Sequence, residues 1–343
     1  MKRLCIAFLL WCCLLPIAAD NYTALWKQWE AAKDKDLPRT EINILEQIVQ
    51  KATADKAYGH LLKAQLRRVV VRTSLSRDSL LPELQHLEKL AAAEKNEVMR
   101  AVRYTTLARY YQELRQTDTT YNTPWRTCCA KALHAPQLLA RTPAKGWEPL
   151  VEKGIDSRIF NDDLLHIIGI ENKAFAFLHT FYEQQGNRRA ACLAAAMELT
   201  ANRETGSTAK KWEKSKYLQR IDSLINVYQD LQEAGELAIA HAQFMREATH
   251  TQDGQLYNYI NYALSKWGTW PRMNCLRNMM SDITQPVFDI SIGDCQLLTG
   301  KSRTIRVNML RHIDQLTFNI YKLSKAENRQ EQDIKEGLAS LMR

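Results

Sequence analysis

The stretch LEQIVQKATADKAYGHLLKAQLRRVV, residues 45–70, contains the repeating pattern that decides the fold. Its apolar residues recur at intervals of three and four in two successive series: Leu45, Ile48, Val49 and Ala52, then Leu62, Leu66, Val69 and Val70. This spacing places the side chains on one face of an α-helix. Each series therefore predicts one amphipathic helix of about 12 to 18 residues, followed by a polar turn.

The same spacing continues on both sides of this stretch. It predicts further helices around Leu25–Trp29, Leu80–Ala91 and Val98–Ala108, and then over residues 161–182, 188–201, 212–231, 235–248 and 256–267. Antiparallel helix pairs that repeat every 34 to 40 residues, roughly, are typical of a tetratricopeptide-type (TPR) α-solenoid. We therefore predict a mainly α protein, with a TPR-like solenoid of antiparallel helix pairs over residues 20–285.

After Pro286 the apolar residues alternate with polar ones, which is the period of a β-strand. Three strands are predicted on this pattern, centred on Phe288–Ile292, Ile305–Met309 and Leu316–Ile320. So few strands leave one apolar face and two hydrogen-bonding edges open. Residues 286–343 are therefore predicted to form a short, incomplete β segment with a polar tail. Either the strands pack on the solenoid, or they begin a larger β domain.

The chain opens with two basic residues and an unbroken apolar run, Leu4–Leu15, which is followed by Ala18 and Ala19. This order is typical of a secretory signal peptide, and the run is shorter than the roughly 20 residues that a membrane helix needs. We expect residues 1–19 to be removed and the protein to be exported, either periplasmic or associated with the cell envelope. Cys12 raises lipidation as an alternative, but Trp11 stands where that processing prefers a small residue.

The formal net charge is +9, and it falls to +7 when Lys2 and Arg3 leave with the signal peptide. The remaining basic residues are scattered, which favours a solvated helical surface. We expect no nucleic acid partner and at most peripheral membrane contact. Five cysteines remain without metal-binding spacing: Cys128, Cys129, Cys192, Cys275 and Cys295. Their number is odd, so the sequence leaves a structural disulfide possible and unproven.

The most chemical-looking group of residues is Asp162, Asp163 and His166. On a helix, this spacing would put a carboxylate and an imidazole on one face, as half of a metal site or as a base with its orienting acid. A helix cap by Asp162 or Asp163, with His166 packed against the next helix, is the favoured interpretation. The sequence has no HExxH, GxSxG or Gly-rich phosphate motif. We therefore predict no catalytic, cofactor-binding or metal-binding residues, and no enzyme.

Seven tryptophans follow the signal peptide, and two interpretations of them are open: Trp26, Trp29, Trp125, Trp147, Trp212, Trp267 and Trp270. Exposed tryptophans on a solenoid could anchor a partner protein. Most of these residues fall on apolar stripes, however, which favours packing between helices. For Trp267 and Trp270, we predict packing at the junction between the helices and the β segment.

Several stretches resemble the amino-terminal region of large, exported alpha-2-macroglobulin-like proteins of Gram-negative bacteria. They occur in the same order along nearly the whole mature chain: Leu25–Gln28, Lys35–Pro38, Tyr58–Ala64, Phe160–His166, Gly186–Ala190, Trp270–Pro271 and Thr304–Leu323. The resemblance implies a helical module that leads into the first macroglobulin-type β domain, in a family that traps and inhibits proteases. The bait region and the thioester would lie beyond Arg343, and the Cys-x-Glu-Gln motif of the thioester does not occur here.

Two functions follow as expectations. The first is a non-catalytic exported scaffold or binding module, the front of an alpha-2-macroglobulin-like protease inhibitor. The alternative is a self-contained periplasmic TPR-like adaptor between proteins. Both expect protein partners, such as proteases or cell-envelope proteins, and neither needs a cofactor.

Overall fold

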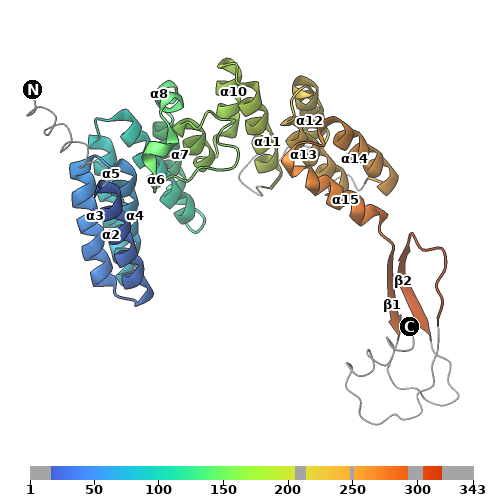
Figure 1. Cartoon of the computed structure of the whole chain (residues 1–343), viewed down its shortest axis with the longest axis horizontal. Helices are drawn as coiled ribbons and strands as arrows, with labels where there is room; N and C mark the ends of the chain where they lie inside the picture. Colours follow the sequence, from blue (N-terminus) through green and yellow to red (C-terminus); the bar gives the residue numbers. More distant parts are fainter. Residues whose placement is uncertain (1–16, 205–213, 248–250, 293–303, 319–343) are drawn as a thin grey trace, which may run out of the picture. The chain divides into compact units, whose positions relative to one another are not determined.

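The computed structural model describes residues 17–204, 214–247, 251–292 and 304–318. The chain is mainly α-helical, and its described residues form fourteen α-helices and one two-stranded antiparallel sheet (Figure 1). It divides into two compact units, Met1–Met273 and Asn274–Arg343. In the described part of the chain, no helix has both the length and the apolar character that a membrane crossing requires.

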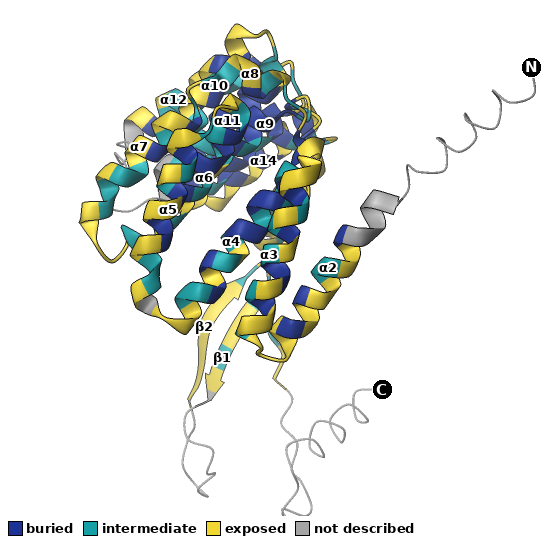
Figure 2. Ribbon diagram, turned by 90° about the vertical axis from the view of Figure 1, so that its left-hand side faces the viewer, coloured by how far each residue is buried: buried dark blue, intermediate teal, exposed yellow. Residues whose placement is uncertain are grey.

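The described helices of the first unit pack mainly on their neighbours in sequence. They are α2 (Ile17–Asp34), α3 (Pro38–Asp55), α4 (Tyr58–Leu75), α5 (Leu80–Ala93), α6 (Glu97–Leu114), α7 (Asn122–Ala132), α8 (Pro136–Arg141), α9 (Leu164–Glu171), α10 (Phe175–Gln184), α11 (Arg188–Glu204), α12 (Lys214–Tyr228), α13 (Ala234–Glu247) and α14 (Asp253–Trp267). Contacts also join α4 to α6, α6 to α9 and α11 to α13. The buried residues form bands along the helices (Figure 2), as expected when amphipathic helices share a core.

The helices α3 and α4 show how closely the apolar spacing predicts burial. In α3, Leu45, Ile48 and Ala52 are fully buried, as predicted. In α4, Leu62 and Val69 are buried, but Leu66 is only half-buried and Val70 is 49% exposed. The predicted stripe on α4 is therefore partly wrong, because this helix packs through a neighbouring face that includes Leu61 and Ala64.

The single helix predicted over residues 161–182 is wrong. Asn161 and Asp162 have positive φ angles, so α9 begins only at Leu164. It ends at Glu171, where the Asn172 side chain donates a hydrogen bond to the Ile168 carbonyl oxygen over 2.8 Å. Lys173 then adopts a left-handed conformation, with φ at 54°, and α10 starts at Phe175. A side-chain cap followed by a left-handed residue stops a helix although the apolar period continues.

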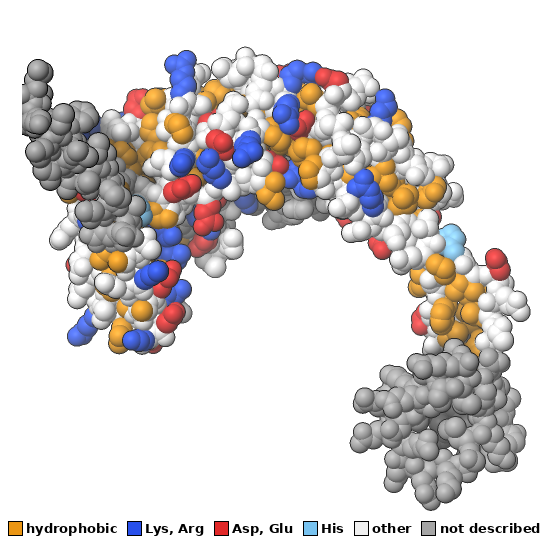
Figure 3. Space-filling view, viewed as in Figure 1, with side chains coloured by type: hydrophobic (Ala, Val, Ile, Leu, Met, Phe, Trp, Pro, Cys, Tyr) orange, Lys and Arg blue, Asp and Glu red, His pale blue; other side chains and the backbone are white. Residues whose placement is uncertain are grey.

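The second unit contains α15 (Asn274–Thr284) and the hairpin of β1 (Val287–Ile292) and β2 (Ile305–Arg311). The chain changes from helix to strand between Thr284 and Val287, at the predicted position next to Pro286. The two compact units divide between Met273 and Asn274, so α15 belongs to the same unit as the strands. The register shifts between Asp289 and Ile290, as in a β-bulge. Apolar side chains gather on the hairpin (Figure 3), where Phe288 is 60% exposed.

The third predicted strand is not formed over Leu316–Phe318, and its last residue, Ile320, lies outside the described residues. The extended chain ends at His312, which has a φ of 54° and whose Nε2 lies 2.8 Å from the Ile283 carbonyl oxygen. A residue in this conformation turns the chain out of the sheet.

The tryptophans serve mainly as core residues. Trp29, Trp147, Trp267 and Trp270 are buried, whereas Trp26 and Trp125 are half-buried and Trp212 lies outside the described residues. Trp267 donates a hydrogen bond to the Gln229 carbonyl oxygen over 3.2 Å, and Trp270 donates one to Glu236. Both residues therefore pack on the region of α12 and α13 within the first unit.

An aromatic cluster joins α2 to α4 through a neutral histidine. The Trp26 indole donates a hydrogen bond to Nδ1 of His60 over 2.9 Å, and the Tyr22 ring stacks on His60 at 4.0 Å. Burial lowers the pKa of His60, and the nearby charge of Lys63 lowers it further. Burial also lowers the pKa of His179 and His241.

The lowered histidine pKa values predict that acid destabilises the fold. An unfolded histidine titrates near pH 6.5, roughly, and each of these three titrates lower in the folded chain, so the unfolded chain binds more protons in between. The histidines' contribution to the free energy of unfolding is complete above the unfolded pKa and is lost as the pH falls through the folded values. We expect the free energy of unfolding, measured by denaturant unfolding, to be lower at about pH 5.5 than at about pH 7.5. If the His60 cluster contributes, the free energy of unfolding should change less between these two pH values in the His60→Gln variant than in the wild type. An equal change in both proteins would contradict a contribution from His60.

Candidate functional site

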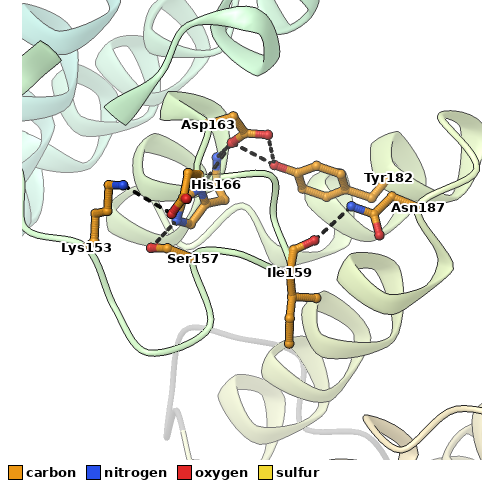
Figure 4. A network of polar contacts seen from close by, with 8 residues as sticks. Lys153, Ser157, Ile159, Asp163, His166, Tyr182 and Asn187 are labelled. Carbon is orange, nitrogen blue, oxygen red and sulfur yellow. Dashed lines mark hydrogen bonds and ion pairs between the residues drawn. The ribbon is translucent and has the colours of Figure 1, made fainter. Parts of the chain in front are cut away.

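A buried polar network holds the irregular segment between α8 and α9 (Figure 4). Asp163 caps α9, as predicted, because its Oδ1 accepts a hydrogen bond from the His166 backbone N–H over 2.9 Å. Tyr182 on α10 donates its hydroxyl to the same carboxylate, at 2.9 and 2.8 Å from the two oxygens. Asn187 donates to the Ile159 carbonyl oxygen over 2.8 Å. The network thus ties this loop to α9, α10 and the start of α11.

Within the network, three side chains have the connectivity of a serine–histidine–aspartate triad. Ser157 Oγ lies 3.1 Å from His166 Nε2, and His166 Nδ1 lies 3.0 Å from Asp163 Oδ1. The sequence spacing indicated that an acid at 162 or 163 could lie on the same side as His166, but Ser157, nine residues before His166, has no spacing signal. The His166 ring stacks on Phe160 of the preceding loop, at 5.1 Å, and Asp163 Oδ1 connects it to Tyr182 on the next helix, α10.

Burial decides what this triad-like group can do. Ser157, Asp163 and His166 are each 3% exposed or less. A nucleophilic hydroxyl must reach a substrate carbonyl, and Ser157 Oγ has no such access. Desolvation also raises the pKa of Tyr182 far above its ordinary value, so its hydroxyl stays protonated as a donor. The group is therefore suited to holding the loop. Asp162 takes no part in the cap and instead pairs with Lys153 at 3.4 Å.

A groove of about 630 Å³ lies beside this loop in the first unit. Three helices and one loop segment line it: α4, α6, α9 and residues 149–152. Between α4 and α9 lies α6, which contacts both. Four half-buried or exposed apolar residues, Leu66, Val70, Leu150 and Ile167, face the hollow. The side chains that leave the predicted stripe of α4 are thus residues of this groove.

The two walls of the groove carry opposite charges. Lys63 and Arg67 belong to α4, while Glu152 and Glu171 belong to the loop and to α9. Lys63 lies over the Trp26 ring at 5.1 Å and Arg67 over the Trp29 ring at 5.5 Å, so aromatic contacts orient both cations. Figure 3 shows basic and acidic side chains intermixed on the first unit, without one large basic patch on the face in view.

The floor of the groove is held together by polar contacts. The Tyr110 hydroxyl on α6 donates to the Leu66 carbonyl oxygen over 3.3 Å. Burial, with a smaller contribution from Glu113, raises the pKa of Tyr110 to about 12. Arg109 on α6 pairs with Glu171 at 3.4 Å. The part-buried Tyr110 contact links α6 to α4, and the exposed Arg109–Glu171 pair reaches from α6 to α9. The helices that line the groove therefore contact one another directly.

Cys128 and Cys192 are buried, Cys129 is half-buried and Cys275 is exposed. None of Cys128, Cys129 and Cys192 forms a disulfide, and Cys295 lies outside the described residues. Burial raises the pKa of Cys128 to about 12 and that of Cys129 to about 11, which keeps both thiols protonated. Among the described residues, no three histidine, cysteine or acidic side chains are gathered so as to hold a metal ion.

Comparison with known proteins adds no relative. No family model, no curated protein and no solved structure matches this chain.

Proposed function

We propose that this chain is an exported, non-catalytic scaffold with a TPR-like solenoid, and that its groove binds a partner protein. The groove between α4, α6, α9 and residues 149–152 is the observation that carries the proposal. The helix contacts support it, because α4 touches α6 and α11 touches α13, each across one intervening helix. Contacts between alternate helices are what stacked helix pairs produce.

The place of this scaffold in a larger assembly is part of the same proposal. The resemblance to alpha-2-macroglobulin-like proteins implies that the helices precede a chain of β domains and position it at the cell envelope. The exposed apolar side chains of Phe288, Val307 and Leu310 on the hairpin support this reading. An apolar sheet face packs against a further layer of structure. Protease inhibition would belong to the complete assembly, and the helical module would hold a partner protein.

The Val70→Asp variant tests the groove. Val70 is already 49% exposed, so the fold should tolerate aspartate, whereas an unpaired carboxylate inside an occupied groove is costly. Purified protein would be used to capture proteins from the envelope fraction of the source cells, and the retained proteins would be identified and purified. We expect the variant to bind such a partner at least about tenfold more weakly than the wild type.

Leu75→Asp is the matched control, because Leu75 lies on the same helix, is 55% exposed and does not line the groove. It should bind the partner as the wild type does. Equal binding by the wild type and both variants would remove the groove from the proposed function.

A further inference from the structure

The groove combines an apolar centre with one basic and one acidic wall. On α4, Lys63, Leu66, Arg67 and Val70 recur at three and four, so two cations and two apolar side chains of one helix face reach the hollow. Across α6, the corresponding positions of the second wall are Glu152 and Glu171. The floor between the two walls carries one charge of each sign, Arg109 and Glu113 on α6, so the contrast in charge lies between the walls. Walls of opposite sign select the charges on the two flanks of a segment that lies between them.

From this arrangement we propose that the groove takes an amphipathic α-helix of a partner protein. That helix carries apolar residues at i, i+3, i+4 and i+7, acidic residues along the flank that faces α4, and basic residues along the flank that faces α9. The apolar stripe lies on Leu66, Val70, Leu150 and Ile167, in the way that amphipathic helices occupy apolar grooves between helices. The inference rests on the proposed function, to which it adds the chemistry of the partner segment.

Charge complementarity favours a helix with one acidic flank and one basic flank. A segment with acids on both flanks would meet Glu152 and Glu171, and one with bases on both flanks would meet Lys63 and Arg67. A mixed helix pairs with both walls. Arg109 and Glu171 pair at 3.4 Å, and that contact is exposed enough for Glu171 to exchange partners.

Three synthetic helical peptides of about 18 residues test the inference, a length at which a helix can persist. All have the same leucine stripe; one has glutamates on one flank and lysines on the other, one has only glutamates, and one has only lysines. Fluorescence anisotropy at low salt measures their binding to the purified protein. We expect the mixed peptide to bind about fivefold tighter than either single-sign peptide.

Reversing one wall should change the preference. In the Lys63→Glu/Arg67→Glu variant both walls are acidic, so the peptide with only lysines should become the tightest ligand. The control, Lys35→Glu/Arg39→Glu, makes the same change in net charge at exposed positions away from the groove and should keep the preference for the mixed peptide. Circular dichroism would check that both variants retain their helix content.

Three outcomes would overturn the inference: binding that ignores the flank charges, no measurable binding of any peptide, or self-association of the protein that Val70→Asp abolishes. The last would assign the groove to a second copy of the chain. If envelope capture still depends on Val70 while the peptides show no preference, the proposed function stands and only the chemistry of the partner helix fails.

Discussion

Replacement of Gly59 with alanine is expected to destabilise the first unit by about 3 kcal/mol or more. Gly59 is the second residue of α4, and a Cβ there would lie 2.2 Å from the Glu148 carbonyl oxygen and 2.4 Å from that of Trp147. Both are backbone atoms, so the clash cannot be relieved by rotating a side chain. Either α4 or the turn at residues 147–148 must move, and with it the stacking of Tyr58 on Trp147 at 5.8 Å.

Gly254→Ala is the control for this variant. Gly254 lies in the first turn of α14, and a Cβ there would meet nothing within 4 Å. Alanine in a helix is favoured over glycine by about 0.5 to 1 kcal/mol, so this variant should be neutral or more stable. Denaturant unfolding followed by circular dichroism compares the two. Similar stabilities for both variants would contradict the close contact between α4 and residues 147–148.

The second large effect is expected at Asp163. Asp163→Asn should lower the free energy of unfolding by about 3 kcal/mol, because one carboxylate oxygen becomes an amide donor among buried donors. The carboxylate now accepts from the Tyr182 hydroxyl and the His166 backbone N–H, and it lies beside His166 Nδ1. Desolvation holds the Tyr182 pKa high, so that hydroxyl cannot adapt by losing its proton.

Asp162→Asn provides the matched comparison one residue away. Asp162 is half-buried, pairs only at 3.4 Å with Lys153, and has a φ of 53°, which asparagine tolerates. We expect the Asp162→Asn substitution to lower the free energy of unfolding by less than about 1 kcal/mol. Thermal unfolding of both variants measures the difference. If the two substitutions were equally mild, the buried network would not be what holds the loop to α9 and α10.

The local pattern predicted the helices well where one apolar stripe faces one core. Leu45, Ile48 and Ala52 show this, since α3 buries the face that their spacing marks. The two hairpin strands were also predicted from local pattern. Apolar and polar residues alternate at Phe288–Ile292 and Ile305–Met309, and this period fits an extended strand and not a helix. The short helices α7, α8 and α15 were not predicted.

The sequence by itself thus determined a mainly helical chain, its switch to strands after Pro286 and a helix cap at Asp162 or Asp163, because each depends on contacts between residues close in the chain. The tertiary structure alone decided which face of α4 is covered, and so turned Leu66 and Val70 from expected core into groove residues. It also brought Ser157 and Tyr182 to His166 and Asp163. Those contacts depend on how a loop with left-handed residues folds back between helices, and no periodic pattern of side chains encodes such a path.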